Sequence, residues 1–507
     1  MRKSSSGQTK IRAGSTRIYG INTNYSPMKE HKNINTKYVI ALALVSAMGG
    51  LLFGYDWVVI GGAKPFYERY FDITSSSTYQ GFAMSSALFG CLIGSVVSGY
   101  FTDKFGRKIP LLFAAFIFIF TSLGTGAFNS FTLFMVFRIL GGIGIGIASN
   151  VSPIYIAEIA PAHMRGKLVA INQLTIALGV LGAQLTNMLI AEPVPLGATD
   201  ALICSSWNGQ MGWRWMFWAC GVPASLFFVL MWFIPESPRW LAKIGKTDKA
   251  FKIFERIGGQ EYAKIETEEI RQSIETVEPG VKSTFAHLFS KQLVPIIILG
   301  IVLAVFQQWC GINVIFNYAE EIFKAAGYGI SGTLFNIVLT GSVSLVFTIV
   351  SMFVVDKWGR KLLMLAGAGG LAIVYMILTT GYFLQIKGFF MLFWVVVAIS
   401  IYCLTLAPIT WVLLSEIFPN KIRGKAMSVA TFALWLSCAV LTISFPFLNK
   451  AFGASGTFAL YSIICIFGFF YILKKLPETK GKSLEQIENE LIRRKINDNK
   501  LNKYQIH

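Results

Sequence analysis

Long apolar runs alternate with short polar segments along almost the whole chain. Each run holds about 18 to 25 residues with almost no charge, which is the length that a helix needs to cross a hydrocarbon core about 30 Å thick. Twelve such runs lie near 38–60, 79–101, 109–128, 131–150, 168–190, 213–234, 293–323, 332–355, 361–384, 389–417, 424–446 and 456–474. The pattern therefore predicts an all-α membrane protein with twelve transmembrane helices.

One polar interval is much longer than the others and divides the runs six and six. It covers about 235–292, carries nearly balanced charge and contains helix-like stretches at 248–256 and 262–275. These features indicate a cytoplasmic helical linker between two bundles. The expected organisation is a cytoplasmic tail at 1–37, a six-helix bundle at 38–234, the linker at 235–292, a second six-helix bundle at 293–474 and a cytoplasmic tail at 475–507.

Composition and the placement of charge agree with this organisation. Hydrophobic residues make up 54% of the 507 residues and charged residues 14%, against roughly 25% charged in a soluble domain. The formal net charge of +19 would suit nucleic-acid binding, but Lys and Arg gather in the two tails and in alternate loops. By the positive-inside rule this bias places both termini in the cytoplasm. We therefore expect a multi-pass protein of the cell membrane that binds no nucleic acid. The predicted outer loops contain no Asn-x-Ser/Thr acceptor site for N-glycosylation, which fits a bacterial inner membrane.

The sequence contains no pattern typical of a metal centre or of an enzyme. Its seven cysteines show no Cys-x-x-Cys or Cys/His spacing, and six of them lie within predicted helices, so neither a metal site nor a disulfide framework is expected. The glycine-rich stretch at 141–146 lies within a predicted helix, where small residues serve packing rather than phosphate binding. We expect no catalytic residues and no cofactor.

Three motifs of the first half recur at matching places in the second half. The segment DKFGRK at 103–108 recurs as DKWGRK at 356–361, each between the second and third helix of its half. The segment EIAPAHMRGK at 158–167 recurs as EIFPNKIRGK at 416–425, and PESPRW at 235–240 corresponds to PETKG at 477–481. The chain therefore contains a duplicated six-helix unit in parallel orientation, an arrangement typical of transporters that rock one half against the other.

Together with other motifs these repeats resemble the sugar porter family of the major facilitator superfamily. The additional motifs are GYD at 54–56, RILGGIGIG at 138–146, QQ at 307–308 and GIN at 311–313. That family includes bacterial xylose-proton symporters and facilitative glucose transporters. The resemblance covers about 38–484 and implies the major facilitator fold and transport of a monosaccharide by alternating access.

The repeated motifs place acidic and basic residues at matched positions. Gly106 and Gly359 stand where the chain reverses in a short turn, and glycine permits backbone conformations that other residues resist. The resemblance implies a cytoplasmic latch, an acid–base lattice that holds this side shut in one state and breaks in the other. Its expected members are Asp103, Gly106, Arg107, Glu158, Arg165, Glu236, Arg239, Asp356, Gly359, Arg360, Glu416 and Arg423. The alternative is that these charges only set topology and cap helices.

Two charged residues, Asp56 and Arg138, lie well inside the predicted helices. A charge there costs at least about 2.5–3.5 kcal/mol and usually faces the bundle interior with a partner. At 1.5 Å per residue, Asp56 lies about 27 Å above the cytoplasmic start of its helix, and Arg138 lies about 10 Å below the outer start of a helix that runs the other way. A carboxyl group whose distance from a guanidinium changes during transport would bind and release a proton. The resemblance supports this hypothesis, since proton-coupled members carry Asp at position 56 whereas facilitators typically carry Asn; a static ion pair is the alternative.

A monosaccharide presents hydroxyl groups and apolar C–H faces, so its site needs amide side chains and aromatic rings. The candidates within apolar helices are Gln173, Gln184, Gln307, Gln308, Asn313, Trp411 and Trp435. The resemblance assigns hydrogen bonding of the sugar to Gln173, Gln307, Gln308 and Asn313, and lining of the cavity to Trp411 and Trp435. Phe53 and Asn317 complete the expected site, although an amide or a tryptophan taken singly can instead join helices.

Several departures from the family pattern leave the sugar open between xylose and a hexose. Asn317 stands where many members have tyrosine, Ser344 and Cys438 stand where facilitators often have Asn, and Val180 replaces a Gln of the xylose symporters. We expect a monosaccharide, protons and membrane lipid as partners, and a chain that functions as a monomer. Three hypotheses compete with this one. The first is a proton-independent facilitator, but Asp56 argues against it. A transporter-like sugar sensor would usually carry a longer cytoplasmic extension, and a drug antiporter would need an apolar pocket without these amides.

Overall fold

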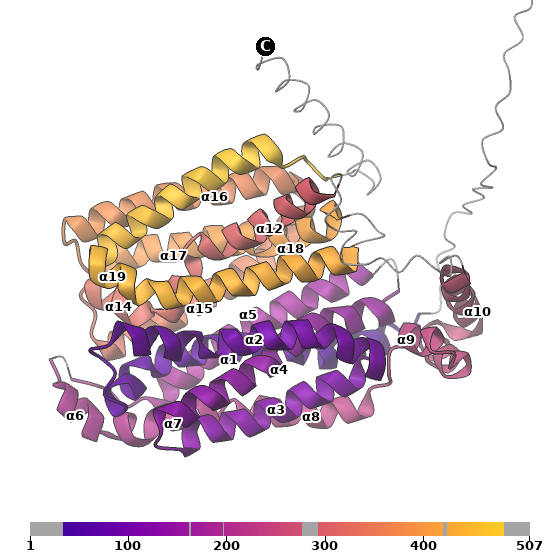
Figure 1. The fold of residues 1–507 in the computed structure, drawn as a ribbon, viewed down its shortest axis with the longest axis horizontal. Coiled ribbons are helices and arrows are strands. Elements are labelled where there is room, and N and C mark those ends of the chain that lie inside the picture. Colours follow the sequence, from indigo (N-terminus) through magenta and orange to yellow (C-terminus); the bar gives the residue numbers. More distant parts are fainter. Residues whose placement is uncertain (1–33, 162–163, 196, 276–292, 419–422, 481–507) are drawn as a thin grey trace, which may run out of the picture.

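The computed structural model describes residues 34–161, 164–195, 197–275, 293–418 and 423–480. Two groups of helices lie against each other, with α1 to α8 coloured from indigo to magenta and α12 to α19 from rose through orange to yellow (Figure 1). The first group comprises α1 (Thr36–Tyr70), α2 (Ser77–Phe105), α3 (Lys108–Ala127), α4 (Phe131–Ile159), α5 (Arg165–Ile190), α6 (Asp200–Ser205), the π-helix η1 (Asn208–Gly212), α7 (Trp213–Trp218) and α8 (Gly221–Phe233). The second comprises α12 (Val294–Trp309), α13 (Ile312–Asn317), α14 (Ala319–Ala325), α15 (Ile330–Trp358), α16 (Arg360–Phe383), α17 (Phe389–Leu404), α18 (Leu406–Ile417) and α19 (Arg423–Lys475).

The membrane-spanning pattern predicted from the apolar runs is confirmed. Within the described residues, 11 helical segments are long and apolar enough to cross a membrane, and the last of them, Lys425–Lys475, has 51 residues. Gly453 interrupts α19 with φ 64° and ψ −177°, so this segment contains two helices, 423–452 and 454–475. The two halves therefore supply twelve membrane crossings. Large apolar side chains such as Leu189, Phe233 and Phe383 are mostly exposed on the outward faces, where lipid is the solvent.

Small residues allow the helices of the first half to pack closely. A Cβ atom on Gly90 of α2 would overlap the carbonyl oxygen of Ile139 in α4, and a Cβ on Gly142 of α4 would overlap that of Ala87 in α2. Such close backbone approach is typical of helix pairs in membranes, where small residues rather than hydrophobic exclusion drive association. The two halves meet chiefly where α2 lies against α19 and α5 lies against α15.

Several helix boundaries differ from those predicted. The first helix does not end near residue 60 but continues to Tyr70, because Lys64 and Glu68 sit one turn apart and form an i,i+4 ion pair of 3.0 Å. The seventh predicted run, 293–323, is not continuous: Gly311, with φ 89°, ends α12 and starts α13. The tenth run is broken at Thr405, between α17 and α18.

The linker contains two described helices, α9 (Pro238–Lys243) and α10 (Thr247–Glu275), with a break at Gly259 (φ 81°). Both lie at one end of the first half (Figure 1). Ala250, Phe254 and Ile257 of α10 belong to one buried cluster with Val39 and Ala43 of α1. The linker helices are therefore packed onto the first half.

Candidate transport site

Asp56 and Arg138 form a buried ion pair in the first half. The guanidinium Nη1 of Arg138 lies 2.7 Å from Oδ1 of Asp56, and the two side chains are 3% and 12% exposed. Arg138 also donates to the backbone carbonyl of Asp56 at 3.4 Å and lies over the ring of Phe217 at 5.5 Å. The second carboxylate oxygen of Asp56 is buried without a hydrogen-bond partner among the described residues. Each charge offsets the desolvation of the other, and breaking the pair would leave an uncompensated buried charge.

A small pocket next to this ion pair opens between the two halves. Its lining includes Asp56 and Trp57 of α1, Arg138 of α4 and Asn317 of α13. Asn317 belongs to the second half, so a residue from each half faces the same space. The carboxylate of Asp56 is thus placed where relative motion of the halves would change its surroundings.

A chain of amide side chains runs through the second half. Gln308 donates to the side-chain oxygen of Gln307 at 3.1 Å, and Asn313 donates to the side-chain oxygen of Gln308. Gln307 in turn lies 3.5 Å from the carbonyl oxygen of Ala407 in α18, so the two adjacent glutamines point to different partners. Asn313 and Asn317 are four residues apart in α13 and therefore share one face of that helix. This face connects the amide chain with the pocket beside Asp56.

Three aromatic rings close the space between the halves. The ring of Trp435 in α19 lies 5.6 Å from that of Phe53 and 5.9 Å from that of Trp57, both in α1. The indole nitrogen of Trp435 is buried without a hydrogen-bond partner among the described residues. Trp57 was not among the residues expected from the sequence, although its position one turn after Phe53 on the same helix could have indicated it.

The remaining amide and tryptophan candidates differ in their burial and contacts. Gln173 and Trp411 are half-buried. Gln184 of α5 is buried with both side-chain polar atoms unpaired among the described residues, and it presses against Gly341 of α15, where a Cβ would overlap its oxygen. Gln184 therefore sits in the interface of the halves. Ser344 contacts the sulfur of Cys403 at 3.2 Å rather than the amide chain.

At the end of the molecule that carries the linker, the repeated motifs of the first half contact one another. Glu158 of α4 accepts hydrogen bonds from Arg107 at 2.7 Å and from Ser237 at 2.5 Å. Glu236, just after α8, accepts from the backbone N–H groups of Arg107 at 2.8 Å and Lys108 at 3.2 Å. These N–H groups begin α3 and have no partner within that helix, so a carboxylate there caps the helix.

The second half repeats this arrangement. Glu416 of α18 accepts hydrogen bonds from Arg360 at 3.1 Å and from Thr479 at 2.5 Å. Glu478, just after α19, accepts from the backbone N–H groups of Arg360 at 2.9 Å and Lys361 at 3.1 Å. The duplication seen in the sequence is therefore a duplication of contacts.

The two capping carboxyls differ in their titration. Burial raises the pKa of Glu236 above the ordinary value of glutamate, and the backbone hydrogen bonds from Ser237 and Arg107 offset part of this effect. Burial also acts to raise the pKa of Glu478, but its backbone hydrogen bonds, from Lys480 first and then from Arg360, outweigh burial and lower the pKa overall.

The other expected latch residues have weaker contacts or lie outside the described part. Asp103 pairs with Lys243 of α9 at 3.2 Å, with both side chains largely exposed. Arg239 lies 3.8 Å from Glu266, and the Nε atoms of Arg165 and Arg239 have no hydrogen-bond partner among the described residues. The side chains of Asp356 and Arg423 lie outside the described residues.

Twelve crossings in two repeated halves, with a polar site between them, define a membrane transporter of the major facilitator class. Residues 42–491 match the family described as sugar (and other) transporter. The chain is 37% identical over 484 residues to the D-xylose-proton symporter of Escherichia coli strain K12, covering 90% of this chain and 96% of that protein. It is 36% identical over 478 residues to the glucose transport protein of a Synechocystis strain, covering 92% of this chain and 100% of that protein.

The fold is also that of a solved relative. A partially occluded inward open conformation of the xylose transporter XylE from E. coli superposes with a TM-score of 0.77 at 34% sequence identity, covering 88% of this chain and 100% of that one. The chain therefore belongs to the sugar porter family of the major facilitator superfamily. It is a multi-pass membrane protein and a sugar transporter, and its family consists of transporters rather than enzymes.

Proposed function

We propose that this sugar transporter is a proton-coupled symporter of a monosaccharide, xylose or a hexose, that works by alternating access in the cell membrane with both termini in the cytoplasm. The observation that carries the proposal is the buried pair of Asp56 and Arg138 beside the pocket between the halves. While Arg138 stays close, the carboxylate is stabilised as an anion. When the halves move and the pair loosens, burial favours the neutral acid. Each cycle would then bind one proton and release it.

The amide chain and the three aromatic rings support a sugar as the cargo. Gln307, Gln308 and Asn313 offer donors and acceptors on one side, and Trp435 and Phe53 offer apolar faces on the other. A pyranose needs both kinds of contact. The names of the relatives, which include a D-xylose-proton symporter and a glucose transport protein, support both a pentose and a hexose as candidates. We further propose that the capping lattice around Glu158 and Glu416 acts as the cytoplasmic latch.

The test is transport in proteoliposomes with labelled xylose and labelled glucose. With the outside more acidic by one pH unit and the membrane potential clamped at zero, a symporter of one proton per sugar accumulates sugar up to about tenfold, because one pH unit is a factor of ten in proton activity. Asp56→Asn should reduce accumulation to the outside concentration while exchange of labelled for unlabelled sugar continues. Glu192→Gln, which removes an exposed carboxylate from the loop after α5, is the matched control and should behave as the wild type.

Three results would contradict parts of the proposal. Wild-type uptake that only equilibrates, with or without a pH gradient, would identify a facilitator. Undiminished accumulation by Asp56→Asn would identify a static ion pair. Binding of sugar without any exchange would favour a transporter-like sensor.

A further inference from the structure

Six charged side chains join the two halves at the end opposite the linker helices. We call them the outer cluster: Lys64, Glu68 and Arg69 of α1, Asp200 of α6, and Glu320 and Glu321 of α14. Lys64 lies 3.0 Å from Glu68 on its own helix, 2.6 Å from Glu321 and 3.6 Å from Glu320. Since α14 belongs to the second half, these contacts hold the outer end closed.

Carboxylates outnumber cations in the buried part of the outer cluster. Arg69 shares its charge between Asp200 at 2.7 Å and Glu320 at 3.5 Å, and Asp200 is 69% exposed, so water screens it. The buried part then contains three carboxylates, those of Glu68, Glu320 and Glu321, around the ammonium of Lys64 and the guanidinium of Arg69. The side chains of Lys64 and Glu68 are only 3% and 4% exposed, that of Glu320 is 10% exposed and that of Glu321 is 24% exposed, although its Oε2 atom is buried. An uncompensated negative charge in such a place is costly unless one carboxylate takes up a proton.

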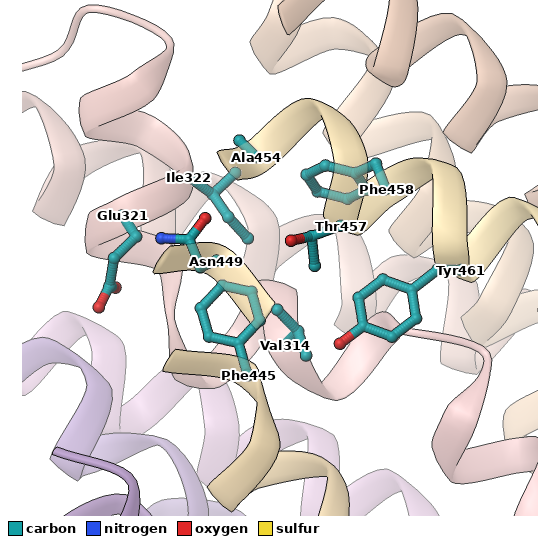
Figure 2. Close-up of a pocket in the computed structure, with 9 residues that line it drawn as sticks. All are labelled: Val314, Glu321, Ile322, Phe445, Asn449, Ala454, Thr457, Phe458 and Tyr461. Carbon is teal, nitrogen blue, oxygen red and sulfur yellow. The ribbon is translucent and has the colours of Figure 1, made fainter. Parts of the chain in front are cut away.

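Two carboxylate oxygens of the outer cluster lack a hydrogen-bond partner among the described residues. One is Oε1 of Glu68 and the other is Oε2 of Glu321, and both are buried. Gln80 donates to the other oxygen of Glu68 at 3.3 Å. Figure 2 shows Glu321 at the edge of a small pocket in the second half, with its carboxylate directed toward the purple helices of the first half rather than toward Asn449.

The neighbouring hydroxyl groups do not supply the missing donors. The ring of Tyr318 lies 5.9 Å from the ammonium of Lys64, but its hydroxyl donates to the carbonyl of Thr442 at 2.7 Å. The hydroxyl of Tyr67 lies 3.3 Å from the sulfur of Met84. A proton on Glu68 or Glu321 would remove the excess charge of the buried part of the cluster.

We infer that the outer cluster is a proton-binding gate, in which closing of the outer end takes up one proton on either Glu68 or Glu321. When the halves separate at this end, the carboxylates meet water and release the proton. The closed state thus binds more protons than the open one, so acidification of the outer side favours closure. This proton enters from and returns to the outer side, so it does not add to the number of protons moved with each sugar. The inference rests on the alternating access of the proposed function, but not on proton transfer at Asp56.

The experiment measures the gate itself rather than transport. Spin labels at Ser75→Cys, in the loop after α1, and at Ala325→Cys, at the end of α14, occupy exposed positions on opposite halves of the outer end. Cys204, which is the partly exposed native cysteine of the described part, is replaced by serine, and the others are buried. Electron–electron distance measurements without sugar, from pH 5 to pH 8, then give the ratio of closed to open populations. A single linked proton changes this ratio by up to about tenfold per pH unit.

Charge-removing variants separate the outer cluster from the site at Asp56. The closed population of the wild type should rise as pH falls, and Glu68→Gln and Glu321→Gln should each flatten this dependence and keep the gate closed at higher pH. Glu192→Gln, an exposed outer carboxylate outside the cluster, should keep the wild-type slope, and Asp56→Asn should retain a pH dependence that the added Glu68→Gln removes. A ratio independent of pH in the wild type would overturn the inference. So would an unchanged slope in both Glu variants, or a slope lost only in Asp56→Asn, which would place the proton at Asp56 instead.

Discussion

Replacing Gly106 with alanine should destabilise the first half more than a glycine-to-alanine substitution at any other of its turns. Gly106 has φ 85° and ψ −159°, a region that costs residues with a Cβ about 1–3 kcal/mol. Its new Cβ would also overlap Oε2 of Glu236, so this carboxylate must move away from the backbone N–H groups of Arg107 and Lys108. Loss of these two charge-assisted caps costs about 1.5 kcal/mol each. The expected sum is about 4–6 kcal/mol.

Two further glycines, Gly359 and Gly99, provide comparisons for the expected loss of stability. Gly359 is the counterpart in the second half, with φ 86°, but its Cβ would lie 2.8 Å from Oε2 of Glu478. The carboxylate of Glu478 needs a smaller shift, so Gly359→Ala should lower the free energy of unfolding by about 2–3 kcal/mol. Gly99 lies within α2 and a Cβ there would have nothing within 4 Å. Gly99→Ala should therefore stabilise α2, by about 0.5–1 kcal/mol.

Thermal unfolding in detergent, followed with a thiol-reactive dye, measures this order. Cys91 and Cys220 are buried in the first half and Cys310 and Cys465 in the second, so each half exposes its own thiols when it unfolds. We expect the midpoints to rank Gly99→Ala above wild type, then Gly359→Ala, then Gly106→Ala. A midpoint of Gly106→Ala equal to that of the wild type would refute the reasoning, since neither the backbone strain nor the cap would then matter.

Three other outcomes follow from the geometry. Gln308→Ala should raise the half-saturating sugar concentration in counterflow by about tenfold to a hundredfold, because it removes one hydrogen-bonding amide and releases Asn313; an unchanged value would make Gln308 a structural residue. Gly341→Ala should lower the population closed at the outer end in the spin-label measurement, because its Cβ overlaps Gln184 across the two halves. An unchanged distance distribution would show that the Gln184 side chain moves aside without separating the halves. The lowered pKa of Glu478 means that its stabilising effect is present at neutral pH and is lost as pH falls below about 4.3 toward that lower value. Glu478→Gln should therefore lose less thermal stability between pH 5 and pH 3 than the wild type. An identical loss in both proteins would contradict the capping role of Glu478.

The repeated pattern of the sequence was sufficient for the fold. Helix length, charge bias and the doubled motifs each depend on neighbours in sequence or on internal duplication, which a single chain reveals. The rise per residue also put Asp56 and Arg138 at compatible depths, and the two residues do form a pair. The depth of a residue follows from its position in the sequence where a regular helix carries it.

The outer cluster could not be predicted in the same way. The sequence predicts the end of the first helix near residue 60, because charges such as Lys64 and Glu68 usually end an apolar run. In the structure these two residues pair with each other and the helix continues. Their other partners, Glu320 and Glu321, lie in a distant part of the chain and are brought close only by the docking of α14 against α1. The contact of Trp57 with Trp435 of the other half is likewise not visible in the sequence, although the place of Trp57 one turn after Phe53 indicates the face that they share.

The residues that cap α3 and α16 have a consequence for biosynthesis. Glu236 and Glu478 each follow the last helix of their half, yet each closes the turn between the second and third helices. During synthesis that turn leaves the ribosome long before its carboxylate does. Each half can therefore complete these contacts only after its sixth helix has been inserted. The cap forms late in assembly, and until then the earlier helices are free to adjust their depth in the membrane.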